Sequence, residues 1–482
     1  MSGARAAARR LPPSKNRNAM LVGAAGVGLL LVGIGLVVAD GDDAEQAEVA
    51  SGTNVAVTGA VADPLVAFNS PAIVASPTDP ETMVVAARVD RPQLGAAVYR
   101  SADAGRTWSA VELPLPAGEV RAHAPDLVFD GAGTLFATFH TVSDPENNPT
   151  AIWLARSDDG GATFEPATRV SGPFGFQPRV AAGEGGDVHV VFVQASEAVA
   201  TVRNGFGPPP NPVMAATSSD GGATFGDPVQ VSADERERVG APVPVVGPGG
   251  RLYVLYQDFG DDADDFEGRP NRSVHEGDFA LVLARSTDGG ESFEEASVVD
   301  DAVVPTERFN PYWPKAPSIA VDSSDGAVYV AWADGTNGDS DVFVRRAPAG
   351  GGEWTARTQV NEDGSAPEAD QYLPVVSVAP GGRVDVAFLD HSGDADNVLA
   401  AAALATSFDR GESWRTVVVS DRMFDSRVGP TSPDAGNADP GSRIGLVSRA
   451  DEALVTWTDT RHGSEDTGRQ DVYFAPVRLV PR

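Results

Sequence analysis

Short runs of alternating apolar and polar residues fill most of the chain after residue 53. Such alternation is typical of strands with one buried face. The runs include TLFATFH, DVHVVFV, RLYVLYQ, AVYVAWA and RVDVAFL, and each follows a turn rich in glycine. The chain holds 52 glycines and 37 prolines, spread along its length, which suits many turns between short strands. The pattern predicts an all-β domain.

An eight-residue pattern, Ser-x-Asp-x-Gly-x-(Thr/Ser)-aromatic, recurs five times between the strand runs. A sixth copy, APAGGGEW, keeps the glycine and the tryptophan but has Ala349 in place of the aspartate. The five complete copies begin at residues 101, 157, 218, 286 and 407, and their aspartates are Asp103, Asp159, Asp220, Asp288 and Asp409. Because a carboxylate accepts backbone N–H groups in tight turns and glycine tolerates positive φ, we expect these aspartates to be structural.

The repeated pattern resembles the Asp box, or BNR repeat, of sialidases and related propellers. The resemblance covers about residues 53–480 and implies a β-propeller of four-stranded blades. It also implies that each box joins the third and fourth strands of a blade, on the rim away from the active site.

Counting the strand groups gives six units that open after a proline, followed by a C-terminal unit of three strands at 443–449, 453–459 and 471–477. The segment NVAVTG at 54–59 is the candidate for the missing fourth strand. A ring closed by both ends of the chain has no free sheet edge. We therefore predict seven blades, with six blades and a C-terminal appendage as the alternative.

The N-terminal segment differs from the rest of the chain. Residues 1–19 are basic, residues 20–39 are an uncharged run long enough to cross a bilayer as a helix, and residues 40–52 form an acidic tether. We expect a single-pass transmembrane anchor with the C-terminal domain outside the cytoplasm. Secretion after cleavage near Ala39 is the alternative.

Charge and cysteine content limit the classes of binding partner and the covalent cross-links that the chain can have. Residues 40–482 carry 31 basic and 68 acidic side chains, so nucleic acid is a poor partner. The chain has no cysteine and therefore no disulfide. We expect a monomeric ectodomain that binds a glycan or a protein of the cell surface or envelope.

Parts of a sialidase-like active site are present. The family's first-blade signature is Phe-Arg-Ile-Pro, but here Asn69 stands at the arginine position, where it cannot form a bidentate pair with a carboxylate. By the resemblance, Arg88 and Asp90 are the candidate catalytic arginine and acid/base aspartate. Further candidates lie near strand ends, with arginines proposed for the site and tyrosines proposed as nucleophile: Arg179, Arg443, Arg461, Tyr312 and Tyr372.

Acidic residues recur where the second strands end. They are Asp258, Asp334, Asp390 and Asp459, and the first three precede loops rich in carboxylates. Equivalent ends in successive blades fall on one face of a propeller, and Ca²⁺ prefers carboxylate and carbonyl oxygens. Two interpretations stay open: a calcium site and solvated acidic loops.

Three functions follow from these features. The first is a non-catalytic surface module that binds a glycan or a protein, and the second is an exo-acting glycoside hydrolase of the sialidase-like class. A structural envelope component is the third. Three arginines converging on the channel would favour the hydrolase, whereas an acidic channel mouth without them would favour binding.

Overall fold

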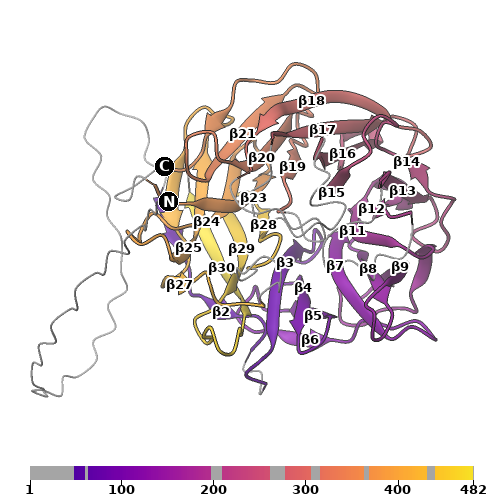
Figure 1. Ribbon diagram of the computed structural model, residues 1–482, viewed down its shortest axis with the longest axis horizontal. Coiled ribbons are helices and arrows are strands. Elements are labelled where there is room, and N and C mark those ends of the chain that lie inside the picture. Colours follow the sequence, from indigo (N-terminus) through magenta and orange to yellow (C-terminus); the bar gives the residue numbers. More distant parts are fainter. Residues whose placement is uncertain are drawn as a thin grey trace, which may run out of the picture. The chain divides into compact units, whose positions relative to one another are not determined.

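The protein is described from a computed structural model, which covers residues 48–59, 63–196, 209–260, 277–305, 315–362, 368–430 and 440–480. Seven antiparallel sheets follow one another around a central axis, and the first strand of each lies nearest that axis (Figure 1). The prediction of seven blades is confirmed. Within the described ranges, no helix has the length and apolar character needed to span a membrane. The predicted anchor at residues 20–39 and the basic segment before it lie outside these ranges.

The strands of each blade follow in chain order from the axis outward. Blade 1 holds β3 (Ala67–Ala75), β4 (Met83–Arg91), β5 (Gly95–Ser101) and β6 (Ser109–Val111). Blade 2 holds β7 (Arg121–Phe129), β8 (Leu135–Val142), β9 (Pro149–Ser157) and β10 (Thr168–Ser171). Blade 3 holds β11 (Gly175–Ala182), β12 (Val188–Gln194), β13 (Val213–Ser218) and β14 (Val229–Gln230). Blade 4 holds β15 (Val239–Gly247), β16 (Arg251–Asp258), β17 (Phe279–Ser286) and β18 (Glu294–Val303).

The remaining blades repeat this order. Blade 5 holds β19 (Ser318–Val321), β20 (Val328–Asp334), β21 (Asp341–Ala347) and β22 (Thr358–Gln359). Blade 6 holds β23 (Gln371–Val378), β24 (Val384–Asp390), β25 (Leu399–Ser407) and β26 (Arg415–Val418), with β27 (Phe424–Asp425) also paired to β25. Blade 7 holds β28 (Gly445–Ser448), β29 (Glu452–Asp459) and β30 (Asp471–Val480), completed by β1 (Glu48–Ser51) and β2 (Val55–Ala56). Two 3-10 turns, Glu184–Gly186 and Pro248–Gly250, join first to second strands in blades 3 and 4.

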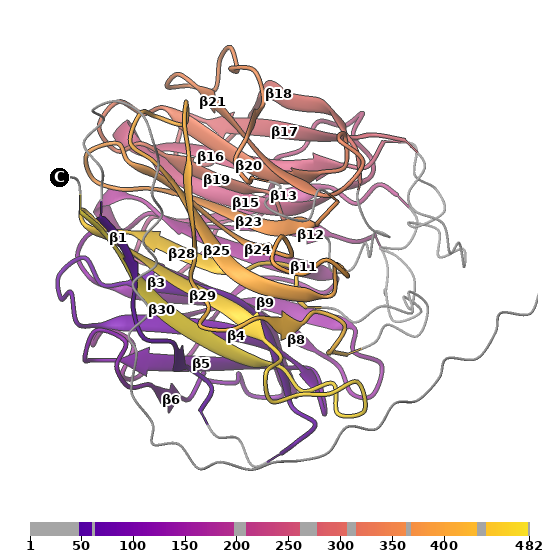
Figure 2. The ribbon, with the colours of Figure 1, turned by 90° about the vertical axis from the view of Figure 1, so that its left-hand side faces the viewer.

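Blade 7 is closed by the N-terminal segment, but not by the predicted strand at 54–59 alone. β1 pairs with the last residues of β30 (Figure 2). β2 pairs with β30 further back, at Phe474 and Tyr473. Pro476 lies between the two pairings, and a proline has no N–H with which to continue the ladder. The outer strand is therefore split in two, and its first part falls in the segment predicted to be the acidic tether.

The five complete Asp boxes form nearly identical turns between third and fourth strands. In each, the Ser hydroxyl donates to the Asp carboxylate at 2.7–2.8 Å and accepts a glycine N–H at 2.7–2.9 Å. The Thr or Ser hydroxyl four residues after the aspartate donates to its other oxygen at 2.5–2.6 Å. We call the side of the ring that carries these turns the box face. The opposite side, where first strands begin and second strands end, is the channel face.

Candidate functional site

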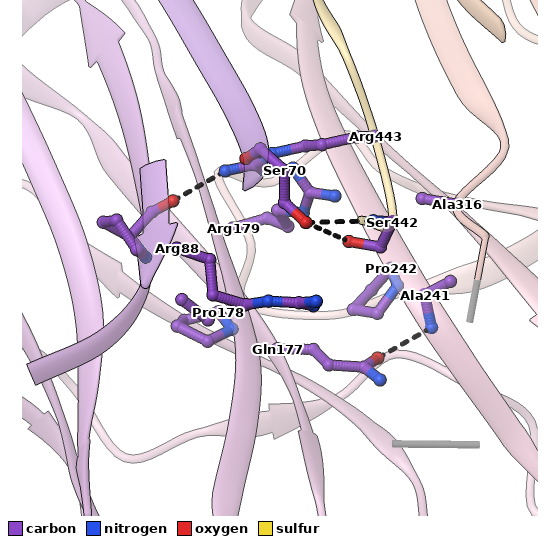
Figure 3. Close-up of a pocket in the computed structure, with 12 residues that line it drawn as sticks. Ser70, Arg88, Gln177, Pro178, Arg179, Ala241, Pro242, Ala316, Ser442 and Arg443 are labelled. Atoms are coloured by element: carbon purple, nitrogen blue, oxygen red, sulfur yellow. Dashed lines mark hydrogen bonds between the residues drawn. The ribbon is translucent and has the colours of Figure 1, made fainter. Parts of the chain in front are cut away.

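A pocket lies at the centre of the ring on the channel face (Figure 3). Its wall comes from the beginnings of the inner strands of several blades, together with one residue near the end of β4. The lining residues are Ser70, Arg88, Ala124, Pro125, Gln177, Pro178, Arg179, Ala241, Pro242, Ala316, Ser442 and Arg443. Three of the six predicted arginine and tyrosine candidates, namely Arg88, Arg179 and Arg443, are therefore brought together.

A repeated β-bulge shapes the wall of this pocket. In five blades, the residue before the proline of the inner strand is a non-glycine residue with φ between 48° and 56°, and the pairing register shifts there. A bulge of this kind bends the strand and redirects the neighbouring side chains. The five residues are Ser70, Ala124, Gln177, Ala241 and Leu373. The first four line the pocket, and three of the prolines that follow them add apolar surface.

Three guanidinium groups from three blades lie at the pocket. Arg88 comes from β4 of blade 1, Arg179 from β11 of blade 3, and Arg443 from the segment that leads into β28 of blade 7 (Figure 3). The lining has no acidic residue among the described ranges, although the chain carries a net charge of −32. The pocket is thus a cationic site on an acidic protein, which favours an anionic ligand.

The side chain of Arg443 connects blade 7 to two other blades. Its Nε donates to the carbonyl of Ser70 at 3.1 Å, and its two terminal nitrogens donate to Asp126 at 2.8 Å and to the carbonyl of Pro125 at 2.6 Å. Blades 1, 2 and 7 are therefore joined through one side chain at the level of the bulges. The acid in this contact, Asp126, was not among the residues singled out from the sequence.

The candidate acid/base residue Asp90 lies beside the pocket in a network of hydrogen bonds. Its Oδ2 accepts Arg88 at 2.8 Å and the amide of Asn69 at 2.8 Å, and its Oδ1 lies 3.4 Å from Nε2 of His123. Burial acts to raise the pKa of Asp90, but Arg88, His123 and Asn69 together hold it below its ordinary value. Burial lowers the pKa of His123 and of His140, whose ring centroids are 5.4 Å apart. Asp90 is thus an ionised partner of Arg88 rather than a proton donor at neutral pH.

The other sequence candidates lie elsewhere. Arg461 pairs with Asp459 at 2.7 Å and lies over the ring of Tyr473, 4.0 Å from its centroid. The Tyr372 hydroxyl lies 3.3 Å from Nε2 of His391 and is not part of the pocket wall. Tyr312 lies outside the described residues.

The four candidate calcium ligands each end the second strand of a different blade, as the strand pattern predicts. Each is engaged within its own surroundings: Asp258 with Arg236 at 2.5 Å, Asp334 with Arg357 at 3.1 Å, Asp390 with Gln371 at 3.1 Å, and Asp459 with Arg461 at 2.7 Å. In the part of the chain that the structure describes, no three acidic or histidine side chains gather in a way that could hold a metal ion. The four aspartates are not brought together, and the calcium site stays a prediction.

Asp126, which the sequence analysis missed, can be recognised when the inner strands of the blades are aligned with one another. The inner strands of blades 2 and 3 open as Ala124-Pro125-Asp126 and Gln177-Pro178-Arg179, so Asp126 and Arg179 occupy equivalent positions. Both blades thus have a charged residue directly after the proline, and Nη1 of Arg179 lies 3.5 Å from Oδ1 of Asp126. Aligning the strand openings against one another would have found this pair.

Comparison with known proteins places this geometry in context. The family described as a BNR repeat-like domain matches residues 37–303. No curated protein matches the chain. The fold is similar to that of a protein of unknown function from Dyadobacter fermentans DSM 18053, at 13% identity over 89% of this chain and 99% of that one, with a TM-score of 0.49.

Two enzymes show comparable likeness. An α-L-arabinanase from Penicillium chrysogenum is 13% identical over 88% of this chain and 98% of its own, with a TM-score of 0.45. A Hadza microbial sialidase is 15% identical over 83% of this chain and 74% of its own, with a TM-score of 0.43. Nothing about the chemistry of this chain follows from likenesses at this level.

Proposed function

This chain belongs to the family of BNR repeat-like domains and is a sialidase-like propeller, and from that starting point we propose that it binds an anionic sugar in its central pocket without hydrolysing it. The observation that carries the proposal is the convergence of Arg88, Arg179 and Arg443 on one pocket. A planar guanidinium matches a carboxylate in shape and charge better than any other side chain does. The proline and alanine residues of the wall would contact the apolar face of a sugar ring.

The groups that the described pocket lining offers favour binding over hydrolysis. Glycoside hydrolysis ordinarily needs two carboxyl groups, or an equivalent nucleophile with an acid, on either side of the scissile bond. The described lining of the pocket offers no carboxyl group and no tyrosine. Asp90 is committed to Arg88 and Asn69, so it has no proton to give at neutral pH.

An exo-acting glycoside hydrolase is the second candidate. It is favoured by the same three arginines, since their convergence is the feature expected of the hydrolase, and by Asp90 at the edge of the pocket. A ligand that drew Arg88 away from Asp90 would free that carboxyl group. The two candidates therefore agree on the ligand and differ on turnover.

The cellular setting belongs to the proposal as well. We propose that residues 20–39 anchor the protein in a membrane with the propeller outside the cytoplasm. The chain enters the propeller at Glu48, which pairs with Val480 at the box-face end of β30. Its ligands would then be glycans or a protein of the cell surface.

Calorimetric titration of the full chain with D-glucuronate, with glucose as the neutral control, tests the binding function. We expect binding of glucuronate alone, and a loss of at least about tenfold in affinity in Arg179→Met, because a charge-assisted pair is removed. Arg169→Met, which removes an exposed arginine from β10, should bind like the wild type. No heat with glucuronate would contradict the proposal.

A panel of fluorogenic glycosides, acidic and neutral, tests the alternative on the same preparations. Turnover that disappears in Asp90→Asn would establish the hydrolase. Binding without turnover across the panel would leave the non-catalytic module.

A further inference from the structure

The three arginines of the pocket differ in how much of their hydrogen-bonding capacity the protein itself uses. Arg443 donates from all three of its nitrogens to Ser70, Pro125 and Asp126. Arg88 donates from two nitrogens to Asp90. Within the part of the chain that the structure describes, Arg179 makes one long hydrogen bond, in which Nη1 lies 3.5 Å from Oδ1 of Asp126. Arg179 is therefore the guanidinium best placed to pair with a ligand.

Asp126 lies behind this guanidinium and is not part of the pocket wall. Its Oδ1 accepts Arg443 at 2.8 Å and Arg179 at 3.5 Å, and its Oδ2 accepts the backbone N–H of Val180 at 3.1 Å. The carboxylate thus has partners from blades 3 and 7 and is fixed at its position on β7. It is an internal carboxylate, paired with two guanidinium groups, next to the group that would meet the ligand.

Burial strengthens the electrostatic interactions of the Asp126 carboxylate. The side chains of Arg179 and Asp126 are only 16% and 13% exposed, so water screens them poorly. Burial raises the pKa of Asp126 in spite of Arg179, and it lowers the pKa of Arg179 in spite of Asp126. A ligand anion that pairs with Arg179 must share this guanidinium with Asp126, and each additional negative charge on the ligand meets additional repulsion.

We propose that Asp126 is the specificity-determining residue of the pocket and restricts it to singly charged anions, such as a sugar carboxylate, against doubly charged ones, such as a sugar phosphate monoester. The inference rests on the proposed function, because it takes the arginine pocket to be the ligand site. Asp126 acts through Arg179 and does not touch the ligand itself. Arg443, in contrast, holds the blades together and would be replaced only at the expense of the fold.

The test is a titration of wild type, Asp126→Asn and Asp126→Glu with D-glucuronate and with glucose 6-phosphate at pH 7.5. Asparagine keeps the shape and the acceptor for the Val180 N–H but removes the charge, whereas glutamate keeps the charge. We expect the wild type and Asp126→Glu to favour glucuronate by at least about tenfold, and Asp126→Asn to shift the ratio toward glucose 6-phosphate by at least about tenfold. Because the ratio is compared between proteins, the different shapes of the two ligands cancel. Thermal unfolding without ligand identifies a variant that has lost its fold.

The outcomes separate this inference from the proposed function. Wild type that binds glucuronate, with an unchanged ratio in Asp126→Asn, keeps the function and overturns the role of Asp126. Wild type that binds glucose 6-phosphate as tightly as glucuronate overturns that role without any variant. If the wild type binds neither ligand but Asp126→Asn binds glucose 6-phosphate, the function fails and the role of Asp126 stands. No binding by any of the three proteins overturns both.

Discussion

In blade 2, the turn after the third strand is stabilised by hydrogen bonds to an aspartate of the turn itself. In blade 5, the corresponding turn lacks that aspartate and is stabilised by a hydrogen bond to a side chain of the neighbouring blade. The blade 2 turn, residues 157–164, centres on Asp159, which accepts the backbone N–H groups of Ala162 and Thr163 at 2.9 Å and the Thr163 hydroxyl at 2.6 Å. The blade 5 turn, residues 347–354, has Ala349 at the aspartate position and no such bonds. Instead, its Gly350 N–H donates to the Tyr253 hydroxyl of blade 4 at 2.8 Å.

Both turns share their contact with the preceding blade. Arg100 of blade 1 donates to the carbonyl of Gly160 at 2.9 Å, and Arg285 of blade 4 donates to the carbonyl of Gly350 at 2.9 Å. In addition, Trp354 of the blade 5 turn donates to Ser297 of blade 4 at 2.9 Å. The comparison teaches that docking against the neighbouring blade is the common requirement. The carboxylate is one way to stiffen the turn that does the docking.

The largest expected effect comes from the glycine that both turns share. Gly161 has φ +83° and a Cβ there would lie 2.7 Å from Val84, while Gly351 has φ +72° and a Cβ would lie 2.5 Å from Leu283. We expect Gly161→Ala and Gly351→Ala each to lower the free energy of unfolding by about 2–3 kcal/mol, through backbone strain and overpacking at the seam between blades. Urea denaturation followed by circular dichroism measures this.

The control for both glycines is Gly131→Ala, a position with no atom within 4 Å of the added Cβ. It should change the free energy of unfolding by less than about 0.5 kcal/mol. If alanine were tolerated in one turn and not in the other, the two turns would not share a common docking requirement.

The smaller effect concerns the aspartate that only one turn has. We expect Asp159→Ala to lower the free energy of unfolding by about 1 kcal/mol, because four donors of the turn lose their acceptor. The matched control is Asp158→Ala, which removes a neighbouring exposed carboxylate and should have an effect below about 0.5 kcal/mol.

The converse substitution in blade 5 sharpens the same point. Ala349→Asp should bring no gain in stability, because Ala347 and Glu353 stand where the complete boxes have hydroxyl groups. A gain of 1 kcal/mol or more, on the order of what Asp159 contributes, would show that the carboxylate alone is sufficient.

The regular parts of this molecule were predictable, because the copies of a repeat can be aligned with one another within a single sequence. Seven blades and the place of each Asp box follow from strand alternation and from five copies of one turn, and the structure has both. The split outer strand of blade 7 was not predictable from alternation. It depends on Pro476 in the partner strand, far away in the sequence.

The candidate site was predictable only in part, because it is the place where the repeats differ. Arg88, Arg179 and Arg443 could be named from strand ends, but their convergence depends on closure of the ring. Asp126 was missed because an acid that follows a proline in a strand has no motif of its own. Its role depends on its contacts with Arg179 in the next blade and with Arg443, which is distant in sequence.

The smallest expected effect is a difference in acid sensitivity between the two turns. Burial acts to raise the pKa of Asp159, but hydrogen bonds from Thr163 and Ser157 lower it to about 2, from an ordinary value of 3.8. Between these values the unfolded chain binds more protons than the native turn does, so the stability that Asp159 contributes is present above about pH 4 and is lost as the pH falls toward about 2. Urea midpoints of wild type and Asp159→Asn should therefore differ at pH 5 and converge toward about pH 2. In Ala349→Asn, at the blade 5 position without a carboxylate, the difference from wild type should not change with pH. A gap between wild type and Asp159→Asn that stayed constant from pH 5 to about pH 2 would mean that the charge of Asp159, as distinct from its shape, does not stiffen the turn.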